Sequence, residues 1–474
     1  MRASIRRNTV LPDAERVLTS YSLVEATRSI RSGRLSPVQL TEHCIERVHA
    51  TENALHAFAT FTPDAAREAA RRSERELADG IWRGPLHGVP VGFKDVIDLA
   101  GLPTRGQSSQ LDGSVATGDA PAARRWLDGG AISLGKLTTH EFAFGAPSET
   151  PDRAARNPWR PAHFTGGSSS GAAAGVASGM LFGALGTDTA GSVRSPAALC
   201  GVTGFKPGRS TIDRRGCVPL APTLDAHGVI GRSAEDCALL YAACAEPAGA
   251  ARIDTSADGL PCLDADVRGL RVGMVRNFWR DATAGSHALE SAVETACAVF
   301  ARLGCSVSDV TLPALEDWNA AGFVILLSEA FSLHERWLRE RPGRYGEAFA
   351  DAVLAGAAFD AADYVTALGA MRALNGAFDE AMTHFDLLIA PIQPGEAPPF
   401  EAVTTWGFLQ RPSFGIPFNL TDSPALSLCC GFGPQGLPLG LQLVGKRGAE
   451  QTVLLAAHRY QSSTDWHRHL PPVP

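Results

Sequence analysis

The chain has 474 residues, of which 45% are hydrophobic and 20% are charged. This composition is typical of soluble globular proteins and excludes wholesale disorder. The 43 basic and 50 acidic residues leave a formal net charge of −7 without any basic run, so we expect no nucleic-acid binding. At about 150 residues per domain the length allows three domains. No linker or internal repeat divides residues 1–474, however, and we expect a single unit.

The first 80 residues have the pattern of helices, and Ser36-Pro37 is a helix-start signal. Alternation typical of a strand then begins at Gly88 and ends at the polar Lys94. A helix over 121–128 and a strand over 131–134 follow, as in a βαβ unit. Residues 145–170 are rich in Gly, Pro, Ser and Asn without periodicity, which predicts a long loop. Such long loops within compact domains tend to be functional.

Short strands and helices alternate through the rest of the chain. Strands are predicted at 182–185, 271–275, 307–312, 387–389 and 440–444, and helices at 171–180, 288–303, 324–339 and 361–383. We therefore expect one mixed α/β unit with a helical insertion at about 315–385. Within it, the core covers 20–245, a variable region covers 246–385, and returning core strands with a C-terminal helix cover 386–465.

The cysteines and the low-polarity segments indicate in which cellular compartment the protein works. None of the ten cysteines forms a C-x-x-C pair, and most lie in apolar runs, so we expect reduced, packed thiols. The first seven residues carry positive charge but no apolar segment follows them, so we expect no signal peptide. The longest low-polarity segment, 171–186, is shorter than the ~20 residues that a membrane helix needs. We therefore expect a cytoplasmic protein without a membrane partner.

Two glycine-rich segments and one lysine carry residues suited to catalysis. Lys94 closes an apolar strand, where burial lowers a lysine pKa; a surface lysine is the structural alternative. Residues 165–171 read Thr-Gly-Gly-Ser-Ser-Ser-Gly and run into an alanine-rich helix. They fit G-x-S-x-G with Ser169 at its centre, but no apolar strand precedes them, which excludes a nucleophile elbow.

The second segment, 186–196, reads Gly-Thr-Asp-Thr-Ala-Gly-Ser-Val-Arg-Ser-Pro. Its small residues allow several backbone N–H groups to turn inward, as an oxyanion hole requires. An ordinary strand-to-helix turn capped by Ser192 is the structural alternative. No lysine stands three residues after Ser192, so the Ser-x-x-Lys arrangement of penicillin-recognising enzymes is absent.

Taken together, Lys94, Ser168 and Ser192 occur in a fixed order among these glycines, and here the chain resembles the amidase signature family of Ser–cis-Ser–Lys hydrolases. Further blocks support the resemblance over about 20–245 and 385–460, among them Gly84-Pro-Leu-His-Gly-Val-Pro-Val-Gly-Phe-Lys-Asp and Gly436-Leu-Pro-Leu-Gly-Leu-Gln-Leu-Val-Gly. The resemblance implies a large mixed β-sheet core flanked by helices on both faces.

The resemblance also implies roles for individual residues. Ser192 would be the nucleophile, Ser168 the bridging serine after a cis peptide bond with Gly167, and Lys94 the base. The backbone N–H groups of residues 189–192 (Thr189, Ala190, Gly191 and Ser192) would stabilise the oxyanion. This chemistry requires no metal or cofactor. Many members have glycine in place of Ala190, and alanine disfavours positive φ, which leaves the fine geometry of the oxyanion hole open.

Other residues are candidates for supporting roles. We expect Asp188 and Arg194 to form a buried pair that holds the loop. The C-terminal His467 and His469 have no companion ligands nearby, so we expect a solvated tail rather than a metal site. Aromatic residues in loops can line a substrate pocket, with core packing as the structural alternative. The candidates for substrate binding are Phe142, Phe144, Trp406 and Phe414.

The predicted function is hydrolysis of a carbon–nitrogen bond in a small molecule through a serine acyl-enzyme. Aryl or aliphatic amides, ureides, urethanes and esters are compatible substrates, and similar proteins are commonly homodimers. A first alternative is the glutaminase subunit of a tRNA-dependent amidotransferase, which would need a large companion chain. A second is a catalytically silent binding protein, against which the intact set of Lys94, Ser168 and Ser192 argues.

Overall fold

The computed structural model describes residues 18–111, 113–147, 153–246, 252–280 and 286–473. All strands formed by these residues join one eleven-stranded sheet in the order β1-β3-β2-β4-β6-β5-β10-β11-β9-β7-β8. Their bounds are β1 Phe58–Phe61, β2 Pro90–Lys94, β3 Ile132–Leu137, β4 Gly183–Asp188, β5 Thr203–Lys206, β6 Ala226–Gly231, β7 Arg271–Val275, β8 Ser306–Val310, β9 Leu387–Pro391, β10 Ala425–Phe432 and β11 Pro438–Gly445.

The sheet mixes parallel and antiparallel pairs. Strand β2 runs parallel to both β3 and β4, as a βαβ arrangement requires, whereas β10 pairs antiparallel with β5 and β11. The expectation of a mixed α/β sheet fold is confirmed. The first 80 residues are not wholly helical, because the four-residue strand β1 pairs with β3 at one edge of the sheet.

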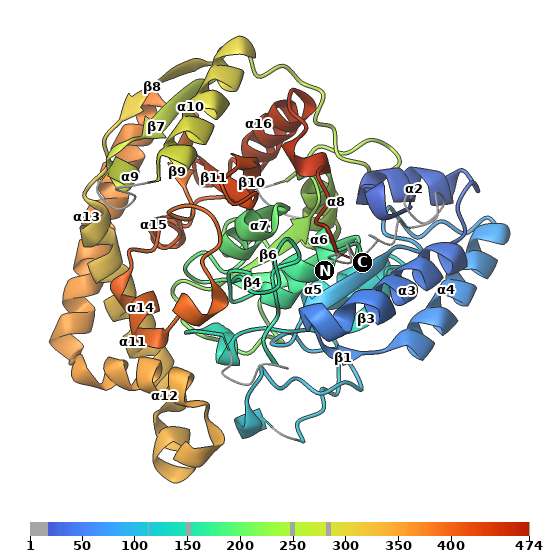
Figure 1. The fold of residues 1–474 in the computed structure, drawn as a ribbon, viewed down its shortest axis with the longest axis horizontal. Helices are drawn as coiled ribbons and strands as arrows, with labels where there is room; N and C mark the ends of the chain where they lie inside the picture. Colours follow the sequence, from blue (N-terminus) through green and yellow to red (C-terminus); the bar gives the residue numbers. More distant parts are fainter. Residues whose placement is uncertain (1–17, 112, 148–152, 247–251, 281–285, 474) are drawn as a thin grey trace, which may run out of the picture.

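Helices cover both faces and both ends of the sheet. Figure 1 shows α2, α3 and α4 at one end and α11, α12 and α13 at the opposite end. Their bounds are α2 Leu23–Arg31, α3 Pro37–Leu55, α4 Pro63–Ala78, α5 Pro121–Asp128, α6 Ser170–Ala177, α7 Arg194–Cys200, α8 Ala234–Cys244, α9 Asn277–Arg280, α10 His287–Arg302, α11 Leu315–Glu340, α12 Glu347–Leu354, α13 Ala361–His384, α14 Thr405–Gln410, α15 Pro417–Leu420 and α16 Glu450–Ser462.

Local signals in the sequence explain several helix starts. Ser36 caps α3 by accepting from the N–H groups of Val38 and Gln39, and the Gln39 side chain accepts from the Ser36 N–H in return. Pro37 occupies the first turn, where its missing N–H costs nothing. The predicted helical insertion corresponds to α11, α12 and α13, which lie between β8 and β9 in the chain.

The hydrophobic core has two layers, one on each face of the sheet. Successive residues of β9 point into opposite layers. Leu387 and Ile389 pack into one hydrophobic cluster, and Leu388 and Ala390 pack into the other. The second cluster also contains the buried faces of α11 and α13. The sheet is therefore buried on both sides along this strand.

Two further expectations concern cysteines and membranes. All ten cysteines are free thiols, and Cys262 is exposed rather than packed. Within the described residues, no single helix is long and apolar enough to cross a membrane, although the bent pair formed by 347–358 and Ala361–His384 passes the same test by length and composition.

Candidate active site

Lys94 lies at the end of β2, in the middle of the N-terminal half of the sheet. Its side chain is fully buried, and its Nζ lies 2.7 Å from Ser168 Oγ and 2.8 Å from Thr187 Oγ1. Thr187 comes from the neighbouring strand β4, which pairs with β2 directly. Strands β2 and β4 therefore bring the lysine and the Thr187 hydroxyl together, and the loop before α6 adds the hydroxyl of Ser168.

The environment of Lys94 favours the neutral amine. Burial lowers the pKa of Lys94 to about 7, and the electrostatic influence of Cys217, Asp188 and Asp225 offsets this effect only in part. Hydroxyl groups, rather than carboxylates, are the direct partners of Nζ. A substantial fraction of Lys94 is therefore able to accept a proton near neutral pH.

Ser168 lies in the loop that precedes α6. The peptide bond between Gly167 and Ser168 is cis. The ring of His140 lies against Gly167, where an added Cβ would come within 2.1 Å of the imidazole. The backbone N–H of Ser169 donates to the carbonyl of Ser192 at 3.1 Å, and this bond ties the bridging loop to the loop of the predicted nucleophile.

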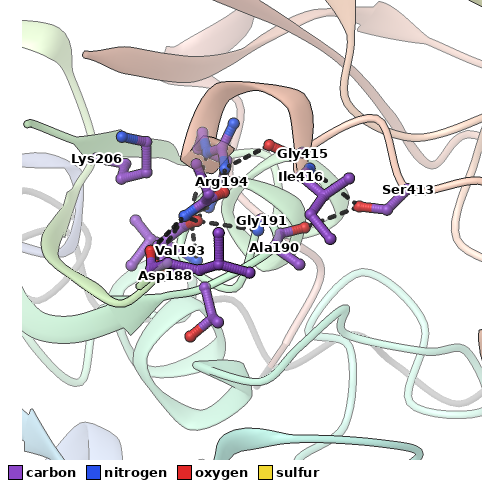
Figure 2. Close-up of polar contacts among 12 residues, drawn as sticks. Asp188, Ala190, Gly191, Val193, Arg194, Lys206, Ser413, Gly415 and Ile416 are labelled. Carbon is purple, nitrogen blue, oxygen red and sulfur yellow. Dashed lines mark hydrogen bonds and ion pairs between the residues drawn. The ribbon is translucent and has the colours of Figure 1, made fainter. Parts of the chain in front are cut away.

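The loop between β4 and α7 is organised around a buried ion pair (Figure 2). Arg194 Nη2 lies 2.8 Å from Asp188 Oδ1, and both side chains are fully buried. Asp188 also accepts from the backbone N–H groups of Gly191 and Val193 at 2.9 and 3.1 Å. Burial alone would raise the pKa of Asp188, but Arg194 overrides it and holds that pKa well below its usual range.

This arrangement changes the expected oxyanion hole. The N–H of Gly191 donates to Asp188, so it is engaged within the loop rather than free for a substrate oxygen. Gly191 also adopts φ 116°, whereas Ala190 is not among the described residues with positive φ. The conformation that needs glycine thus occurs one residue after Ala190.

Residues after α14 support the same loop from outside. Ser413 Oγ donates to the carbonyl of Ala190 at 3.0 Å and accepts from the N–H of Ile416 (Figure 2). Gly415 packs so closely that an added Cβ would lie 2.4 Å from the Ala190 carbonyl oxygen. Sequence reasoning assigned no role to Thr187, Ser413 or Gly415. Only the strand pairing and the return of residues 413–415 to this loop reveal them.

A cavity of about 400 Å³ opens beside the two serines. Ser168 and Ser192 both line it, together with Thr189 and Ala190. Its remaining wall comes from segments that are far apart in the sequence, including the loop 145–170, α11 and residues after β9.

The predicted substrate-binding residues differ in position. Phe144 and Phe414 line the cavity. Phe142 does not line it, because its ring is buried in the core against His334 and Phe349, with centroids 4.4 and 5.1 Å apart. The expectation that Phe142 contacts a substrate is therefore corrected to core packing. Trp406 lies in α14, and its side chain is outside the part of the structure that is described.

The described residues contain no group of three or more His, Cys, Asp or Glu side chains that could hold a metal ion. His469 is exposed but packs on Trp466 and Phe432, with centroids 6.1 and 5.2 Å apart. Burial lowers the pKa of the neighbouring His467 to about 4. His467 thus lies in the 3₁₀ turn Trp466–Arg468, and His469 follows this turn directly, so the two histidines do not form a wholly solvated tail.

Comparison with known proteins places the chain in a family. The family model described as Amidase matches residues 39–454, and the chain belongs to that family. One relative, a glutamyl-tRNA(Gln) amidotransferase subunit from Chloroflexus aurantiacus, is 34% identical, with 96% of this chain and 99% of that protein covered.

Solved structures give the same assignment. A crystal structure of an amidase superposes with a TM-score of 0.84 at 31% identity and covers 94% of this chain and 100% of its own. The peptide amidase of Stenotrophomonas maltophilia superposes with a TM-score of 0.82 at 28% identity, covering 96% and 98% of the two chains. The chain is accordingly a hydrolase of the class that acts on carbon–nitrogen bonds.

Proposed function

We propose that this protein hydrolyses an amide-type bond of a small molecule through an acyl-enzyme on Ser192, with Ser168 as the bridging serine and Lys94 as the base. The contact of 2.7 Å between Lys94 Nζ and Ser168 Oγ carries the proposal, together with the shared cavity of the two serines. A serine hydroxyl needs a base to become a nucleophile, and a lysine with a pKa of about 7 is such a base.

The proposed reaction has two halves. In the first, neutral Lys94 takes the proton of Ser168, Ser168 takes that of Ser192, and Ser192 Oγ bonds to the carbonyl carbon. The tetrahedral intermediate collapses as the proton returns through Ser168 to the leaving nitrogen, and the amine departs. In the second half, water gives its proton to the same relay and attacks the ester, and the relay returns that proton to Ser192 Oγ as the acid is released. Carbamates and esters would follow the same course.

Backbone donors for the oxyanion are proposed at Thr189, Ala190 and Ser192. The loop that carries them is held by the Asp188–Arg194 pair. Gly191 is given a different role, because its N–H is bound by Asp188 and its backbone conformation shapes the turn. Fixed N–H donors of this kind contribute about 2.7–4 kcal/mol each to transition-state stabilisation in acyl transfer.

Labelling with a fluorophosphonate tests the proposal directly. We expect mass spectrometry to find the adduct on Ser192, and we expect Ser192→Ala to lose both labelling and amide turnover. Ser463→Ala is the matched control, since its hydroxyl bonds to the carbonyl of Arg459 near the C-terminal end of α16. An adduct on another serine, or turnover by Ser192→Ala at the wild-type rate, would contradict the assignment.

A second candidate is the glutaminase subunit of an amidotransferase. The relative from Chloroflexus aurantiacus, a glutamyl-tRNA(Gln) amidotransferase subunit with 34% identity over nearly the whole chain, favours it. This candidate predicts release of ammonia from glutamine that depends on a companion chain. Incubating the isolated chain with glutamine and with simple aryl amides separates the two candidates.

The assembly of the protein is part of the same proposal. We propose that the chain folds as one unit over 1–474, works in the cytoplasm without a nucleic-acid partner, and forms a homodimer. Light scattering after gel filtration should then give about twice the monomer mass of 49.9 kDa, with or without added tRNA. A monomer mass would contradict the dimer, and a shift with tRNA would favour the amidotransferase role.

A further inference from the structure

We infer that the cavity beside Ser168 and Ser192 takes an uncharged amide or carbamate with an aryl or branched alkyl group, and that it discriminates against a zwitterionic amide such as glutamine. The inference rests on the proposed function, since it concerns the substrate of the same site. It follows from the hydrogen-bond partners, the charge and the apolar surface of the side chains that form the cavity wall.

The polar side chains of the wall are mostly committed to protein partners. Thr189 Oγ1 donates to Asp225 at 2.6 Å, and the Ser413 hydroxyl donates to a backbone carbonyl at 3.0 Å. Ser195 Oγ accepts from the side-chain amide of Gln393. A hydroxyl that already has such a partner gains little by exchanging it for a ligand.

The charged side chains of the wall are the ones that could recognise an amino acid. Among the described lining residues these are Glu396 and Arg411, from opposite ends of the segment after β9. The Glu396 carboxylate accepts from the backbone N–H groups of Gln435 and Leu437 at 3.0 and 2.9 Å, so it is held by the β10–β11 turn. Arg411 is exposed, which places it at the rim. An α-ammonium group would therefore have to compete with these backbone donors for the one carboxylate among the described lining residues.

His140 also lines the cavity but adds no charge. Burial lowers its pKa to about 4, so the ring is neutral at pH 7. Its Nδ1 lies 2.8 Å from the carbonyl oxygen of Gly145, which can only accept, so Nδ1 carries the proton. A neutral imidazole is compatible with an uncharged substrate and supplies no counter-charge to a carboxylate.

Apolar side chains form most of what remains. Six of the largest come from five separate segments, which are the loop 145–170 with the residues just before it, the β5–β6 connection, α11, the residues just after β9 and the segment after α14. These six are Phe144, Phe164, Leu220, Phe323, Ile392 and Phe414. Such a wall stabilises an aryl or branched alkyl group by removing it from water, whereas an unpaired charge placed there loses its hydration without compensation.

Glutamine and 4-methylpentanamide form a matched pair for the test, because the second replaces the ammonium and carboxylate of the first with two methyl groups. Direct detection of released ammonia gives kcat/KM for both. We expect the neutral amide to be favoured by about 100-fold or more, given the cost of desolvating two unpaired charges. We expect Phe414→Ala to lower kcat/KM for the neutral amide about tenfold, and Ser463→Ala, at the C-terminal end of α16, to leave it unchanged.

Each outcome bears on the inference separately from the proposed function. Equal or better turnover of glutamine, or loss of that turnover in Arg411→Leu, would overturn the inference while Ser192 labelling still supported the hydrolase. If neither amide is turned over, we compare the rates at which Ser192 reacts with two fluorophosphonates, one with an alkyl group and one with a carboxylate. Faster labelling by the alkyl probe supports the inference, and faster labelling by the carboxylate probe overturns it. Absence of Ser192 labelling by both probes would instead refute the proposed function.

Discussion

Replacing Lys94 with methionine should make the protein more stable at neutral pH while abolishing amide hydrolysis. The drop in the pKa of Lys94 from 10.5 to about 7 is a penalty of about 5 kcal/mol on the buried charge, at about 1.36 kcal/mol per unit. Methionine removes this penalty but leaves two hydroxyl groups without their partner, at about 1 kcal/mol each. The expected net gain at pH 7 is about 3 kcal/mol.

The sign of the pH dependence distinguishes this explanation from ordinary repacking. The unfolded lysine keeps its proton up to pH 10.5, whereas the folded one keeps it only up to about 7. Between these values the unfolded state binds more protons, so wild-type stability rises by about 1.4 kcal/mol per pH unit relative to Lys94→Met. The variant's gain in free energy of unfolding is therefore largest below pH 7, and above pH 10.5 it becomes a loss of about 2 kcal/mol.

Urea unfolding across about pH 6 to 9, followed by circular dichroism, measures this difference, and kcat/KM on a neutral amide measures activity. Lys446→Met is the matched control, since Lys446 is 44% exposed and should show no such slope. A constant stability difference between wild type and Lys94→Met at every pH would refute the buried-amine argument. Undiminished hydrolysis by the variant would refute its role as the base.

Further predictions concern pH, the loop and its packing. Wild-type kcat/KM should fall about tenfold per pH unit below pH 7, because only neutral Lys94 accepts a proton; a pH–rate profile flat to about pH 5 would count against this. Asp188→Asn leaves Arg194 buried without a counter-charge and should lower the free energy of unfolding by about 3–5 kcal/mol in urea; an unchanged midpoint would disprove it. Gly415→Ala forces a Cβ to 2.4 Å from a carbonyl oxygen of the loop that carries Ser192 and should cost about 100-fold in kcat/KM, whereas Gly376→Ala, in open space, should cost nothing. Equal activity of the two glycine variants would show that the loop tolerates the shift.

Local sequence signals predicted many elements with close bounds. The helix Pro121–Asp128 and the strand Arg271–Val275 agree with prediction at both ends, because proline starts the first and alternation of apolar residues marks the second. Strands β1, β5, β6 and β10 were not predicted. Strand β6 reads Ala-His-Gly-Val-Ile-Gly, which has no clear period of two, and it is stabilised by pairing with β4 and β5 rather than by its own residues.

The sequence by itself determined the family, the order of Lys94, Ser168 and Ser192, and the mixed α/β class, because these depend on residue types at fixed spacings and on local periodicity. Only the tertiary structure decided that Thr187 contacts the lysine, that the Gly191 N–H is taken within its own loop, and which of two nearby phenylalanines lines the cavity. Those contacts join strands and loops that are distant in the sequence and become neighbours only through the strand order of the sheet. Residue type does not distinguish the two phenylalanines. The backbone between them turns through positive φ, and although both rings belong to the same buried cluster, only that of Phe144 lines the cavity.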